Sequence, residues 1–238
     1  MAFTSDPRVA QGRVASADID VGLRQYMLSV FNYMGLGLAI TGIVAMFIAA
    51  TPALYGPIFG TPLKWVVMLA PLGFVMFLGA KLPTMSVSAA QITFWLFAGV
   101  MGLSMASIFL VFTGESIARV FFITAATFGA TALYGYTTKR DLSQFGSFLF
   151  MGLIGIVIAS LVNIFIGSSA LQFAVSVIGV LVFTGLTAYD AQRIKEMYYS
   201  VQGSDMVAKS AIMGALSLYL NFINLFTMLL QLFGQQRN

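Results

Sequence analysis

The chain has 238 residues, of which 59% are hydrophobic and only 8% are charged, and its formal net charge is +4. A soluble domain is typically about 25% charged, so this composition indicates a membrane protein and excludes an ordinary soluble one. The absence of Cys and His excludes disulfides, thiolate nucleophiles, imidazole bases and the usual zinc sites. The basic residues are scattered between apolar segments and therefore predict no nucleic-acid surface.

Seven apolar segments follow one another along the chain. Each is close to the roughly 20 residues that a spanning helix needs, and such runs favour helices over the alternating strands of a barrel. We expect residues 1–24 to form a polar tail without a cleaved signal peptide and residues 25–238 to form one transmembrane domain. The predicted spans are 26–50, 63–81, 88–112, 117–138, 145–166, 171–191 and 210–233. The sequence thus predicts an all-α integral membrane protein with a seven-helix bundle.

Basic residues are unevenly distributed over the predicted loops. If the N-terminus is cytoplasmic, the tail and every second loop hold nine of the 12 Lys and Arg residues: Arg8, Arg13, Arg24, Lys81, Lys139, Arg140, Arg193, Lys195 and Lys209. Basic residues accumulate on the cytoplasmic side of membrane proteins. We therefore expect a cytoplasmic N-terminus and an outside C-terminus, whereas an even number of spans would bring the C-terminus inside.

The last predicted span carries polar residues along one side. At about 100° per residue, one sector holds Ser210, Gly214, Ser217, Asn221, Asn224 and Gln231. Polar side chains that face lipid are costly, so we expect this span at the centre of the bundle. Two interpretations remain open at this point. The polar groups bond to neighbouring helices, or they line a partly hydrated path.

One carboxylate, Asp190, lies near the end of the span at 171–191. A charged side chain at the centre of a spanning helix costs about 2.5–3.5 kcal/mol, which makes Asp190 a candidate functional residue. The alternative is structural, because Arg193 follows at i+3 and its guanidinium can pair with the carboxylate. From position alone, both interpretations stand.

Two local patterns concern packing. Glu115 and Arg119, at i and i+4, predict an ion pair at the membrane interface. The small residues Gly35 and Ala39, and likewise Ala125 and Gly129, stand at helical spacing and predict close approaches between helices. Neither pattern specifies a function.

Three segments resemble one known family. They are ALYGYTTKRDL at 132–142, FTGLTAYDAQRIK at 183–195 and LYLNFINLF at 218–226. They resemble the bacterial, YccA-like branch of the Bax inhibitor-1 family, within the transmembrane Bax-inhibitor-motif superfamily. The resemblance extends from the first predicted span to the last. It implies a seven-helix fold with a central last helix and a proton-sensitive calcium leak through the bundle.

The resemblance also implies roles for single residues. In the family, two Asp residues in the last two spans form a hydrogen-bonded pair whose protonation controls the pore. Asp190 matches the first, whereas Asn221 stands where the family commonly has the second. Two close carboxylates share a proton, and Asn221 cannot ionise, so we expect altered pH sensing. Lys81 matches a basic residue of the second span that contacts the pair, and Arg193 is a second candidate charge partner.

The leading hypothesis is a calcium-leak channel of the bacterial inner membrane. Asp190, Asn221 and Asn224 would line or gate the path, and Asp190 would form a weak Ca²⁺ site, because Ca²⁺ prefers oxygen ligands. The alternative is a protein that restrains an FtsH-type membrane protease, with residues 1–24 as the handle. We expect no enzyme and no cofactor, because the spans hold no acid–base pair or metal cluster. The expected partners are Ca²⁺ and the lipid bilayer.

Overall fold

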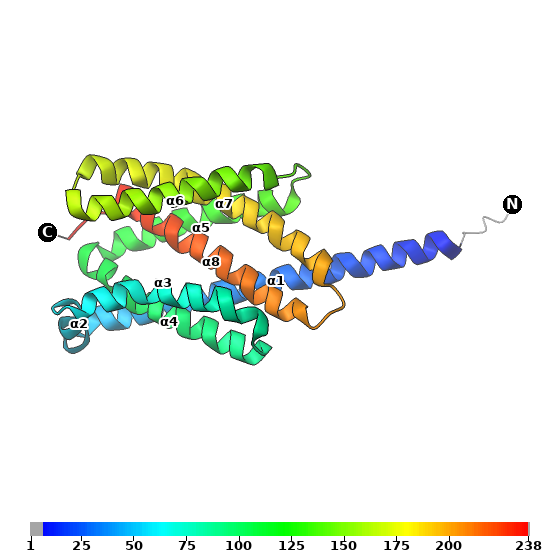
Figure 1. Ribbon diagram of the computed structural model, residues 1–238, viewed down its shortest axis with the longest axis horizontal. Coiled ribbons are helices and arrows are strands. Elements are labelled where there is room, and N and C mark those ends of the chain that lie inside the picture. The colour runs from blue at the N-terminus through cyan, green and yellow to red at the C-terminus, as the bar shows by residue number, and fades with distance from the viewer. Residues whose placement is uncertain (1–6, 238) are drawn as a thin grey trace.

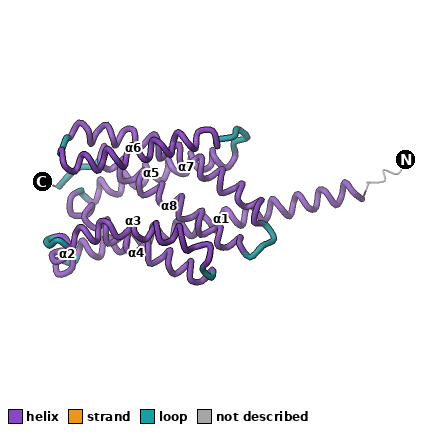
Figure 2. The backbone as a smooth tube through the Cα atoms, viewed as in Figure 1, coloured by secondary structure: helices purple, strands orange, loops and turns teal. Residues whose placement is uncertain are grey.

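The computed structural model describes the backbone of residues 7–237 and the side chains of residues 21–237. Within this part the elements are helices: α1 (Pro7–Ala50), α2 (Pro52–Phe59), α3 (Leu63–Lys81), η1 (Leu82–Thr84), α4 (Val87–Val111), α5 (Gly114–Thr137), α6 (Ser143–Ile166), α7 (Ser169–Val201) and α8 (Met206–Phe233). Short loops join them (Figure 2). Seven of the helices are long and apolar enough to cross a membrane. The predicted all-α, seven-span architecture is confirmed.

The helices differ from the predicted spans at three places. The expected loop after the first span contains α2, which begins at Pro52, where the missing N–H of proline costs nothing. The α7 helix continues past residue 191 to Val201, because the intervening charged residues are good helix formers. It stops before Gly203, whose φ is 76°. The α1 helix begins at Pro7, so the expected tail at 1–24 is partly helical, and its remainder lies outside the described residues.

The α8 helix lies at the centre of the bundle, with α6 and α7 on one side and α3 and α4 on the other (Figure 1). It packs against α7, α1, α5 and α4. Of its apolar span segment 61% of the residues are buried, against 6% for α6. The buried Tyr219 hydroxyl lies 2.6 Å from the hydroxyl of Thr41 on α1. The predicted central position of the last span is confirmed.

Close helix approaches involve glycines other than the predicted ones. Gly35 on α1 and Gly129 on α5 are both exposed, and no heavy atom lies within 4 Å of the position of a Cβ on either, so the contacts expected at these two glycines are wrong. Instead α5 meets α7 at Gly135, where a Cβ would lie 2.8 Å from the backbone of Ala188. Only a residue without a side chain lets two helices approach this closely. The predicted Glu115–Arg119 ion pair is present at 2.8 Å.

Candidate functional site

The Asp190 carboxylate is the charged group that α7 places inside the bundle. The residue is 7% exposed. Its Oδ1 lies 2.9 Å from Nη2 of Arg193, and its Oδ2 accepts a 2.8 Å hydrogen bond from Nδ2 of Asn221 on α8. A buried charge must be paired and hydrogen-bonded to persist. Both carboxylate oxygens therefore have partners, one from each of the two helices.

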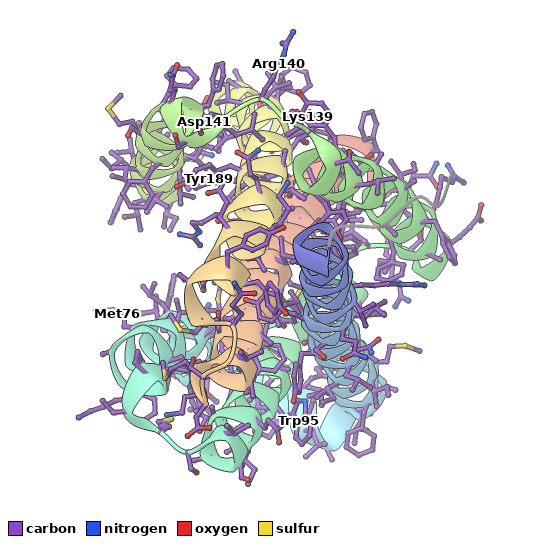
Figure 3. All side chains as sticks on the ribbon, turned by 90° about the vertical axis from the view of Figure 1, so that its right-hand side faces the viewer. Met76, Trp95, Lys139, Arg140, Asp141 and Tyr189 are labelled. Carbon is purple, nitrogen blue, oxygen red and sulfur yellow. The ribbon has the colours of Figure 1, made fainter. Side chains whose placement is uncertain are left out.

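Arg193 extends this network toward the protein surface. Its side chain is 46% exposed. The same Nη2 donates to the Ser217 hydroxyl at 3.2 Å, and the guanidinium lies 5.8 Å from the ring centre of Tyr189, close enough for a cation–π contact. Figure 3 shows Tyr189 leaving α7 on the side of α6, beneath the turn that carries Lys139, Arg140 and Asp141.

The network lies at one end of a large cavity. The cavity has a volume of about 1090 Å³, and its lining comes from α3, α4, α6, α7 and α8. Besides Asp190 and Arg193, its polar lining residues are Ser104, Ser107, Ser147, Ser217, Asn221, Asn224, Thr227 and Gln231. On α8 the lining runs from Ser217 to Gln231. At 1.5 Å per residue this is about 21 Å, or most of the roughly 30 Å hydrocarbon thickness.

The middle of the cavity offers oxygen atoms to an occupant. Asn224 donates its amide N–H to the carbonyl of Leu220 at 2.8 Å, and the Thr227 hydroxyl donates to Ile223 at 2.8 Å. The Thr227 hydroxyl proton and one of the two Asn224 amide protons are therefore used within α8, while the amide and hydroxyl oxygens keep lone pairs. A lining of this kind suits a cation or another hydrogen-bond donor.

Lys81 is not brought to this network. It is exposed at the end of α3 and does not line the cavity. In the described part of the chain, the ion pair at Asp190 is made by Arg193. No group of three acidic, His or Cys side chains that could hold a metal ion occurs among those residues. A cation at Asp190 would meet one carboxylate, neutral oxygens and the guanidinium of Arg193, so the weak Ca²⁺ site expected from the sequence stays a prediction.

Gln192 has a role that the sequence analysis did not identify. It is buried, accepts a hydrogen bond from the Leu142 N–H and donates one to the Arg140 carbonyl, both at 2.8 Å. These bonds tie the α5–α6 turn to α7, two residues from Asp190. In that turn, hydrogen bonds from Ser143 hold the pKa of Asp141 below its ordinary value. The only signal in the sequence was a polar residue next to a candidate site.

Several known proteins are similar to this chain in sequence. A family model described as inhibitor of apoptosis-promoting Bax1 matches residues 23–238. The chain is 48% identical to a protein of Rickettsia prowazekii over 92% of this chain and 93% of that protein. It is 47% identical to the inner membrane protein YbhL of Escherichia coli, over 91% and 94%. A membrane protein of Streptococcus pyogenes is 34% identical over 91% and 95%.

Proposed function

The chain belongs to the Bax inhibitor-1 family of membrane proteins, and on that premise we propose that it is a calcium-leak channel. The observation that carries the proposal is the position of Asp190, a buried carboxylate at one end of a cavity with a polar lining on α8. Ca²⁺ prefers oxygen ligands, and weak, successive sites allow an ion to leave as well as enter. Asn221 and Asn224 supply further oxygens along the path.

The described arrangement is a closed state in this proposal. Arg193 neutralises Asp190, and Asn221 holds its second oxygen. A cation reaches the carboxylate only by displacing the guanidinium, which is half-exposed and can turn outward at modest cost. Conduction is therefore slow, as a leak requires.

The site holds a single carboxylate, that of Asp190, whereas two close carboxylates would share a proton. Without a second carboxylate, no proton-sharing pair exists to titrate near neutral pH. We expect Ca²⁺ flux to change little between pH 6 and pH 8. In Asn221→Asp a second carboxylate would stand within hydrogen-bond distance of Asp190, and flux should then depend on pH in this range.

The test is Ca²⁺ entry into proteoliposomes that contain an indicator dye, at pH 6 and pH 8. Wild type, Asp190→Asn and Asn221→Asp are compared with Asp141→Asn, which removes a carboxylate outside the cavity. We expect Asp190→Asn to approach empty liposomes and Asp141→Asn to match wild type. Equal flux in Asp190→Asn and wild type would refute the channel proposal. An unchanged pH response in Asn221→Asp would refute the account of pH sensing.

For its location, the proposal is the bacterial inner membrane, with the N-terminus cytoplasmic and the C-terminus outside. The Escherichia coli relative is named an inner membrane protein, and the basic residues of this chain gather on one side of the spans. Their excess on the side of the α5–α6 turn supports a cytoplasmic position for that turn.

A second candidate function is restraint of an FtsH-type membrane protease. The observation in its favour is that α1 extends well beyond the ends of the other helices at its N-terminal end (Figure 1). Such an extension offers the protease a segment that it can bind without contacting the bundle. Removal of residues 1–20 should then abolish copurification with the protease and leave Ca²⁺ flux unchanged. Copurification that survives the truncation would refute this role of the extension.

A further inference from the structure

The large cavity is open on one side. The α6 helix packs on α7, and α3 packs on α4, while α8 lies between the two pairs (Figure 1). The cavity reaches both α3 and α6. Leu72 on α3 is 60% exposed and Phe150 on α6 is 58% exposed, and both line the cavity. Apolar side chains this exposed in membrane-spanning helices face lipid. We call this side-open cavity the α3–α6 groove.

The floor of the groove is polar although its rims are apolar. Asn224 and Thr227 on α8 and Ser107 on α4 line it, and all three are only half-buried. Polar groups in contact with lipid tails alone carry an unpaid desolvation cost. Asn224 and Thr227 each make one hydrogen bond to the α8 backbone, and their remaining oxygen lone pairs and the second Asn224 N–H suit an occupant that has hydrogen-bonding groups of its own. Lipid tails at the open side would bring no hydrogen-bonding group.

The polar floor connects the two ends of the groove. At one end lies the half-exposed guanidinium of Arg193. At the other end is the exposed Gln231, whose Oε1 accepts a 2.8 Å hydrogen bond from the Ser176 hydroxyl. Between these two ends the lining on α8 runs for about 21 Å, which is most of the roughly 30 Å hydrocarbon thickness. A molecule that keeps its polar part on this floor can keep its apolar part in the bilayer throughout.

We propose that the α3–α6 groove is a path by which phospholipid headgroups cross between the two leaflets. The barrier to crossing is the loss of hydration of the headgroup in hydrocarbon, and the floor replaces part of that hydration. The acyl chains stay outside, between the apolar rims. At one entrance Arg193 is half-exposed, and its guanidinium keeps N–H donors for the phosphate besides the Nη2 group that is paired with Asp190 and bonded to Ser217. The oxygens of Asn224 and Thr227 suit an ammonium donor. The expected lipid is therefore phosphatidylethanolamine. This activity does not depend on Ca²⁺ conduction.

The test is lipid exchange between leaflets in proteoliposomes without Ca²⁺. The vesicles carry phosphatidylethanolamine labelled on an acyl chain with a fluorophore that external dithionite bleaches. With wild type, bleaching should continue beyond the outer leaflet. Loss of one hydrogen-bonding group at mid-path should slow this second phase roughly fivefold in Asn224→Leu and Thr227→Val.

Thr131→Val is the matched control. Thr131 on α5 also donates its hydroxyl to a carbonyl of its own helix, at 2.9 Å, but it lies outside the groove. It should keep the wild-type exchange rate, while all three variants keep the wild-type elution volume. Exchange no faster than in empty vesicles, or equal slowing in Thr131→Val and Thr227→Val, would overturn the proposal. Bleaching of a water-soluble dye trapped inside would also overturn it, because dithionite would then be crossing a pore.

Discussion

Replacement of Gly135 by alanine should destabilise the bundle where α5 crosses α7. A Cβ on Gly135 would lie 2.8 Å from both Cα and the carbonyl carbon of Ala188, and closer still to its carbonyl oxygen. These are helix backbone atoms, so relief requires the two helices to separate, at a cost of about 3 kcal/mol. The better helix propensity of alanine offsets about 1 kcal/mol. The net loss is about 2 kcal/mol, or a Tm lower by about 4–8 °C.

Gly129→Ala on the same helix is the matched comparison. No heavy atom lies within 4 Å of its Cβ position, so only the propensity gain remains, and Tm should rise by about 2–4 °C. Thermal unfolding in one detergent can be followed by the fluorescence of the two tryptophans, Trp65 and Trp95. A Gly135→Ala protein that melts at or above the wild-type temperature would refute the reasoning. Because Ala188 precedes Asp190 by two residues, Ca²⁺ flux should change in Gly135→Ala as well.

Three further predictions concern hydrogen bonds and topology. Tyr219→Phe removes a buried 2.6 Å hydrogen bond to α1 and should lower the unfolding free energy by about 1 kcal/mol in thermal unfolding, whereas an unchanged Tm would contradict this. Gln192→Leu frees the turn at 139–142, so trypsin should cut there faster than in wild type at equal protease concentration. Since the chain has no Cys, single introduced cysteines report on topology. In intact cells an impermeant maleimide should label Thr61→Cys and not Ser204→Cys, and the opposite labelling pattern would contradict the predicted topology.

Local sequence patterns were sufficient for the helices and their order. Apolar runs between charged clusters predict seven spans, because a bilayer leaves the backbone no other partner than itself. The central position of α8 follows from its polar side, since residues such as Asn221 cannot face lipid tails at low cost. Both predictions concern one helix at a time.

Contacts between helices were harder to predict. The Asp190–Asn221 hydrogen bond depends on how far α7 is displaced along α8, and only the family resemblance pointed to it. The turn held by Gln192 and the close approach at Gly135 also depend on how far two neighbouring helices are displaced along each other. Small residues were a poor guide, because Gly129 fits the helical spacing as well as Gly135 does but lies on the exposed side of α5. A single sequence does not specify which side of a helix packs against which neighbouring helix.

The central position of α8 also has a consequence for how the protein is made. This helix follows the other six spans in the chain, so it leaves the ribosome after them, yet it is the most buried of the seven. Until it is inserted, Thr41 lacks its partner Tyr219, and Asp190 lacks Asn221. The earlier helices can enter the bilayer one by one, but they cannot reach their final packing. Assembly is therefore completed at the end of translation. In a nascent chain stalled before α8, the Asp190 carboxylate would lack its partner on α8 and would be accessible to the proteases that remove misfolded membrane proteins.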